Sequence, residues 1–96
     1  MDNERRADLG YNAIREAGAQ TNVITQETVE TCISDVLAYV AHLCDRAGLN
    51  PDEMFARGML SYHGDAEDGP PAQPILDGTT AMWHDLPVPD KPWGAV

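Results

Sequence analysis

The sequence predicts an all-α fold, in which a small three-helix domain is followed by a Pro-rich, largely irregular C-terminal tail. Apolar residues recur every three or four positions in the first two thirds of the chain, which is typical of amphipathic helices. Helix-capping residues separate these stretches, and six of the seven prolines come after residue 63. We therefore expect helices over about 2–17, 26–47 and 51–62 within a helical domain at 1–63, and an acidic linker and extended tail over 64–96.

The first helix is expected to span residues 2–17. Helix-forming residues dominate this stretch, and Leu9 and Ile14 contribute to a thin apolar stripe. Gly18 follows at the position where glycine commonly ends a helix, so the helix is predicted to stop there.

The second helix has the clearest pattern in the chain. Thr25 is expected to cap its N-terminus, and Gly48 to end it. Its apolar residues fall within one arc at about 100° per residue, whereas Glu30, Asp35 and His42 lie elsewhere. The residues predicted to face the core are Val29, Ile33, Val36, Leu37, Val40, Leu43 and Cys44.

The third helix is predicted from its first residues. Asn50 suits the N-cap, and Pro51 suits the first helical position. Because the link from Gly48 is short, helices two and three should be antiparallel or steeply angled neighbours. The residues expected to be buried are Met54, Phe55, Met59 and Tyr62.

The last third of the chain holds both tryptophans, Trp83 and Trp93. Residues 64–73 resemble a flexible acidic linker, residues 79–84 could form one helical turn, and the prolines favour extended chain beyond it. Exposed tryptophan is costly and is common at interface hot spots. The tail therefore either wraps the helices of its own chain or docks onto a partner.

The charge balance restricts the classes of partner. The 96 residues include 16 acids and 6 bases, a net charge of −10, which disfavours direct binding to nucleic-acid phosphates or to an anionic membrane. Residues 1–63 hold 10 acids and 5 bases, and residues 64–96 hold 6 and 1. The start of the chain lacks the apolar segment of a secretory signal, so we expect a cytoplasmic protein. A basic partner protein is the expected ligand.

No residue pattern predicts a catalytic or metal site, and no cofactor is expected. Asp35, Tyr39 and His42 share one stripe of the second helix, followed by Arg46, but Asp35 and His42 are about 10 Å apart along the axis, which is long for one small ion. This stripe is interpreted as facing solvent or a second subunit. Because three short helices make a marginal core, the alternatives are tail wrapping and a homodimer through the helix at 26–47.

The stretch from Ile33 to Phe55 resembles two groups of proteins. One comprises small helical accessory proteins encoded by bacteriophages and prophages, which share a similar helix-turn-helix pattern around His42-Leu-Cys-Asp. The other is the MazG-like family of all-α nucleoside triphosphate pyrophosphohydrolases, whose metal helix is similar to the segment from Asp35 to Tyr39. That family uses two pairs of carboxylates to hold magnesium, but Cys32 stands where its pattern has a glutamate.

The first resemblance and the charge together imply a non-enzymatic inhibitor. Such a protein would bind a host defence protein that handles nucleic acid, in the manner of anti-CRISPR proteins, by occupying its basic groove. The predicted partner-binding residues are Glu30, Asp35, Asp52, Glu53, Trp83 and Trp93. The MazG-like resemblance implies the alternative, a magnesium-dependent nucleotide hydrolase or a nucleotide-sequestering protein using Glu27, Glu30, Asp35 and His42.

Overall fold

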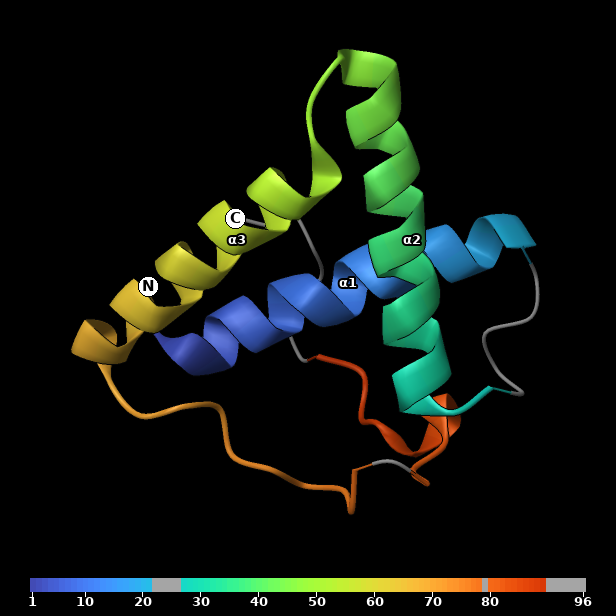
Figure 1. The fold of residues 1–96 in the computed structure, drawn as a ribbon. Coiled ribbons are helices and arrows are strands. Elements are labelled where there is room, and N and C mark those ends of the chain that lie inside the picture. The colour runs from blue at the N-terminus through green and yellow to red at the C-terminus, as the bar shows by residue number, and fades with distance from the viewer. Residues whose placement is uncertain (22–26, 79, 90–96) are drawn as a thin grey trace.

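A computed structural model describes residues 1–21, 27–78 and 80–89 and contains three α-helices (Figure 1). They are α1 (Asn3–Thr21), α2 (Val29–Ala47) and α3 (Pro51–Gly64), and the short 3-10 turns η2 (Asp65–Asp68) and η3 (Trp83–Asp85) follow. Within the described ranges no residue belongs to a β-strand, and the β-type pairing there is an isolated bridge. The predicted all-α fold with an irregular C-terminal segment is confirmed.

α1 begins close to its predicted start and ends later than predicted. The Asp2 carboxylate accepts a hydrogen bond of 2.8 Å from the Arg5 N–H, which caps the first turn. The predicted end at Gly18 was wrong, because Gly18 lies inside α1 and is buried. Glycine costs a helix about 1 kcal/mol relative to alanine. The burial of Gly18 is a tertiary feature that local sequence does not reveal.

α2 begins three residues after its predicted start. The Thr28 side chain, not that of Thr25, accepts the capping hydrogen bond from the Thr31 N–H at 3.1 Å. Glu27 forms a bend before the helix, and residues 22–26 lie outside the described residues. The reason for the later start is a long-range pairing. The Trp83 N–H donates to the Glu27 carbonyl at 2.9 Å, and the Val29 N–H donates to the Ala81 carbonyl at 2.8 Å.

The junction between α2 and α3 follows the prediction closely. Gly48 ends α2 in the left-handed conformation, with a φ of 75°, and the Leu49 N–H donates to the Cys44 carbonyl at 2.8 Å. Asn50 caps α3 through a 3.1 Å hydrogen bond from the Glu53 N–H, and Pro51 occupies the first turn. α3 continues to Gly64, two residues beyond its predicted end.

The three helices enclose an open angle (Figure 1). α2 and α3 diverge from the turn at 48–50, and α1 passes behind α2 about midway along it. The chain after η2 passes below α1 and returns to the N-terminal end of α2, where the Thr28–Met82 bridge forms. α2 and α3 are therefore steeply angled neighbours.

The described part of the C-terminal segment packs on the helices. Trp83 is 5% exposed, and its ring stacks on Tyr11 of α1 with the centroids 4.6 Å apart. The Gln73 N–H donates to the Glu4 carboxylate at 2.8 Å. A 3-10 turn, η3, forms at Trp83–Asp85, later than the helical turn expected at 79–84, and residue 79 lies outside the described residues. Of the two alternatives for the tail, the described residues show wrapping around the chain's own helices.

The core is smaller than the sequence predicts. Among the described residues, the buried hydrophobic side chains are Cys32, Cys44 and Trp83. Met59 and Tyr62, which were predicted to be buried, are 51% and 58% exposed. That prediction was wrong because α3 diverges from α2 after their shared turn, and a cavity lies between its last turn and α1.

Candidate protein-interaction surfaces

The four predicted acidic partner-binding residues form two separate groups. Glu30 lies in the first turn of α2, whereas Asp52 and Glu53 lie in the first turn of α3, beyond the opposite end of α2. A helix of 19 residues is about 28 Å long, so these groups are far apart. Asp35 lies five positions after Glu30 and points about 140° away from it around the helix. All four side chains are exposed, but the structure does not gather them into one patch.

Three of these acids lie in the first turn of a helix, where a negative charge is favourable. Acids in a first turn face the positive end of the helix dipole, which stabilises them without an ion pair. Glu30 is placed in this way by the Thr28 cap, and Asp52 and Glu53 by the Asn50 cap. In the part of the chain that the structure describes, no ion pair involves an acid of α2 or α3. Their charge is therefore available to a partner.

The two tryptophans of the predicted site have different outcomes. Trp83 belongs to the core, so a partner could reach its ring only by displacing η3 from Tyr11. Its placement corrects the expectation that it contacts a partner directly. Trp93 lies outside the described residues.

The carboxylates relevant to a nucleotide hydrolase do not converge in the described structure. Glu27, Glu30 and Asp35 precede or lie along one helix, and no group of three or more His, Cys, Asp or Glu among the described residues is arranged to hold a metal ion. Cys32 is buried, and burial, with Glu27 and Asp35 nearby, raises the pKa of its thiol. Because the thiolate is the nucleophile and metal ligand, Cys32 is suited to packing rather than to chemistry.

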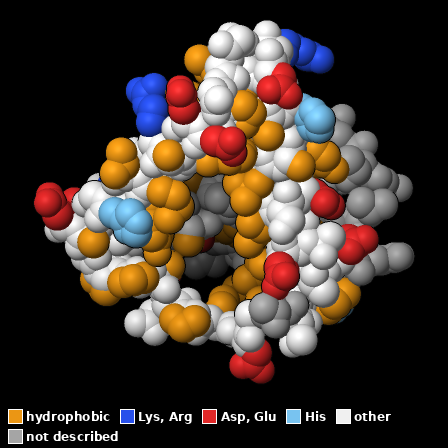
Figure 2. All heavy atoms as spheres, viewed as in Figure 1, with side chains coloured by type: hydrophobic (Ala, Val, Ile, Leu, Met, Phe, Trp, Pro, Cys, Tyr) orange, Lys and Arg blue, Asp and Glu red, His pale blue; other side chains and the backbone are white. Residues whose placement is uncertain are grey.

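Sequence reasoning missed an apolar surface, which we call the α2–α3 apolar face. On α2 it consists of residues expected to be core, and Leu37 and Leu43 are 50% and 60% exposed. Figure 2 shows hydrophobic side chains along both helices, around a hollow in the molecule. The members of the face are Ile33, Leu37, Val40 and Leu43 of α2 and Met59 and Tyr62 of α3. The prediction that these residues lie in the core was wrong, because the pattern shows that they share one side of a helix but not that α3 and α1 leave this side uncovered.

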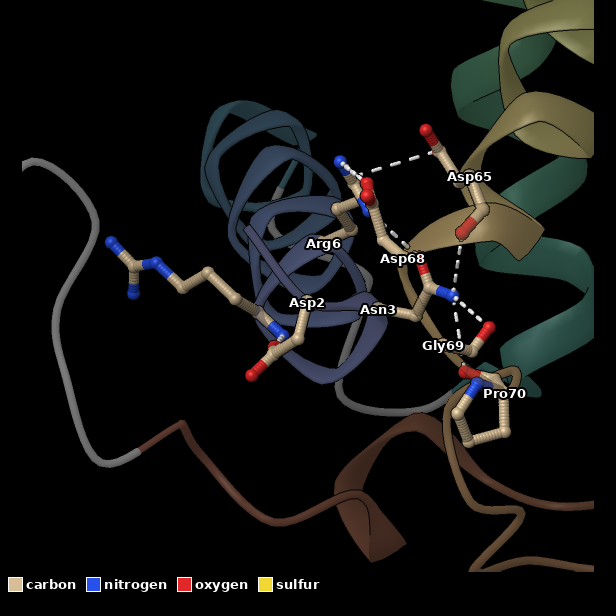
Figure 3. A network of polar contacts seen from close by, with 8 residues as sticks. Asp2, Asn3, Arg6, Asp65, Asp68, Gly69 and Pro70 are labelled. Carbon is tan, nitrogen blue, oxygen red and sulfur yellow. Dashed lines mark hydrogen bonds and ion pairs between the residues drawn. The ribbon is translucent and has the colours of Figure 1, made fainter.

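A polar clasp joins the start of α1 to the turn after α3 (Figure 3). The Asn3 Nδ2 atom lies within hydrogen-bond distance of the carbonyl oxygens of Asp65, Gly69 and Pro70, at 3.2, 3.1 and 3.0 Å. The Arg6 guanidinium lies 2.7 Å from the Asp68 carboxylate and 3.6 Å from that of Asp65. These acids were expected in a solvated flexible linker. They instead anchor the chain because Arg6, about sixty residues away in sequence, folds beside them.

The clasp borders a cavity of about 500 Å³ between α1 and α3. Asn3, Arg6 and Asp65 lie in its wall, but they are already joined to each other in the clasp. Its other lining residues are mostly apolar: Ala7, Tyr62, His63, Ala66, Pro71 and Ala72. The polar groups at the edge of the cavity are therefore already bonded to each other, and few remain to bind a small ligand.

No family model, curated protein or solved structure matches this chain. No helix in the described part is long and apolar enough to cross a membrane. The fold and the exposed groups define a small all-α protein with two kinds of exposed surface, acidic helix ends and an apolar face.

Proposed function

We propose that the chain is a non-enzymatic binding protein that covers a basic surface of a nucleic-acid-handling protein. The observation that carries the proposal is the unpaired acidity of α2 and α3. These helices carry five exposed acids but only two exposed arginines, Arg46 and Arg57. The acids have no ion pair within the described residues. Such a surface attracts a basic groove and repels nucleic-acid phosphates, so the two would compete for one site.

The distribution of charge favours α2 and α3, rather than the C-terminal segment, as the part of the chain that binds the basic partner. Asp65 and Asp68 of the C-terminal segment are held by Arg6, which lowers the net charge that this segment presents. The backbone that carries Glu30, Asp52 and Glu53, in contrast, is held in capped first turns of helices. Rigid charges lose less conformational entropy on binding than charges on a mobile chain. The resemblance to small phage-encoded accessory proteins adds that the partner is a host defence protein.

The proposal is tested by affinity capture with charge-neutralised variants of the full chain. One variant carries Glu30→Gln, Asp35→Asn, Asp52→Asn and Glu53→Gln. The matched control carries the same number of neutralised acids elsewhere: Asp8→Asn, Glu16→Gln, Glu67→Gln and Asp77→Asn. Circular dichroism checks that both remain helical, since neutralising an acid in a first turn costs about 0.3–1 kcal/mol.

The expected result is a basic protein that the wild-type chain and the control retain from a cell extract at low salt and that the first variant does not. Raised salt should release it, because screening weakens exposed charge pairs beyond about 10 Å at 0.1 M ionic strength. The captured protein should also lose its bound nucleic acid as the chain is added. Equal retention by both variants, or release that is independent of salt, would contradict the proposal.

A further inference from the structure

We infer that the chain forms a homodimer through the α2–α3 apolar face, a conclusion separate from the proposed binding of a basic partner. The first argument is the area left exposed. The chain exposes 7242 Å², whereas a folded monomer of 10.5 kDa is expected to expose about 5400 Å². Its radius of gyration is 14.2 Å, against about 12.5 Å expected for a compact domain of this length.

The excess area matches what a stable dimer needs. It amounts to about 1800 Å² for one chain, and obligate homodimers bury about 1000–2500 Å² from each partner. The exposed apolar side chains that would supply this area are concentrated on α2 and α3. A monomer with an open angle rimmed by such side chains would leave them in water (Figure 2).

Charge placement on α2 fits self-association. At about 100° per residue, one arc of about 120° holds only apolar residues, and Glu30, Asp35 and Asp45 lie outside it. Two chains of net charge −10 can therefore approach along this arc with their acids directed outward. The arc consists of Val29, Ile33, Val36, Leu37, Val40, Leu43, Cys44 and Ala47, and of these Cys44 is buried within its own chain.

A twofold arrangement uses this arc symmetrically. When two copies of α2 cross antiparallel, Leu37 and Val40 lie nearest the axis, while Ile33 and Leu43 lie toward the two ends of the contact. These end positions are about 15 Å apart along the helix. Met59 and Tyr62 of α3 then extend the contact from α2 to α3, so each copy covers the α2–α3 apolar face of the other.

The second copy is favoured over a different protein because of the small core. With three buried hydrophobic side chains in the described residues, the chain requires a partner for most of its apolar burial. A partner that is required for folding must be present at the same place and in equal amount as the chain is made. Another copy of the chain satisfies this condition without further components.

The test measures the mass of the full chain by size-exclusion chromatography with light scattering over a wide range of concentration. The wild-type protein is expected at twice the 10.5 kDa of one chain. Its thermal midpoint should rise with protein concentration, since association stabilises the folded state by mass action. Leu37→Glu, at a position half exposed in the single chain, should have the mass of one chain at concentrations where the wild type is a dimer.

The matched control is Val88→Glu, which makes the same type of change at a position 62% exposed but outside the apolar face, and which should remain a dimer. If Leu37→Glu also loses its helices, the wild-type concentration dependence decides the question alone. A wild-type mass of one chain with a constant thermal midpoint would overturn the inference. So would a Leu37→Glu protein that remains dimeric, or a wild-type chain that folds only in the presence of a different protein.

Discussion

Replacing Trp83 by alanine should remove a large share of the stability of the protein. The indole is 5% exposed and stacks on Tyr11, and the backbone beside it pairs with Glu27 and Val29 at the start of α2. Trp83 therefore joins the C-terminal segment to two helices at once. Its loss would release η3 from α1 and weaken the segment that holds the N-terminal end of α2.

The magnitude follows from the area that the ring buries. A buried tryptophan removes about 150–250 Å² from water, which at about 25 cal/mol/Å² corresponds to about 4–6 kcal/mol. Large-to-small changes of aromatic residues in cores cost about 3–5 kcal/mol, so we expect a loss in that range for Trp83→Ala. The total free energy of unfolding of a 96-residue protein is about 5–14 kcal/mol. Trp83→Phe, which preserves an aromatic ring against Tyr11, should lose about 1–2 kcal/mol.

The assay is urea unfolding followed by circular dichroism, with all proteins at one concentration. Val88→Ala is the control in the same segment, because Val88 is exposed and should change the free energy of unfolding by less than about 0.5 kcal/mol. A Trp83→Ala protein that unfolds within about 0.5 kcal/mol of the wild type would refute the packing of the C-terminal segment on α1.

Substitutions at three further positions test local features. Asn3→Ala should lower the free energy of unfolding by about 1–2 kcal/mol in urea, because it removes the donor shared by three carbonyls; a value near zero would mean that the clasp does not persist in solution. Thr28→Ala should cost about 1 kcal/mol and Thr28→Asn much less, since asparagine also caps; equal losses would argue against the cap. Burial raises the pKa of Cys32 above its ordinary value of 9.0, so the stability that the neutral thiol contributes is present below about pH 9 and is lost as the pH rises toward the folded-state pKa. The urea midpoint of the wild type should therefore fall faster than that of Cys32→Ala above about pH 9, and parallel curves would contradict this placement.

The sequence predicted best those features that depend on neighbouring residues. The end of α2 at Gly48 and the start of α3 at Asn50-Pro51 were correct, because a glycine with positive φ and an asparagine cap act within one turn. The start of α2 was predicted incorrectly. Thr25 and Thr28 are equivalent caps by type, and the choice between them is made by backbone pairing with Ala81 and Trp83.

The candidate site depended on contacts that sequence spacing does not reveal. The acids Glu30, Asp35, Asp52 and Glu53 were correctly expected at exposed positions on helices two and three, but the length of α2 separates them. The stack of Trp83 on Tyr11 links positions 72 residues apart in the chain. The exposure of the α2–α3 apolar face depends on the angle between two helices, which the short turn at 48–50 leaves open.

Competition between this chain and nucleic acid for the captured basic protein is the most direct test of the proposed function. Fluorescence anisotropy of a labelled nucleic acid would follow its release as the full chain is added. We expect the wild-type chain to release the nucleic acid, and this release to weaken as salt is raised. The variant with Glu30, Asp35, Asp52 and Glu53 neutralised should release little. A ternary complex, in which the nucleic acid stays bound at saturating chain, would contradict the proposed function.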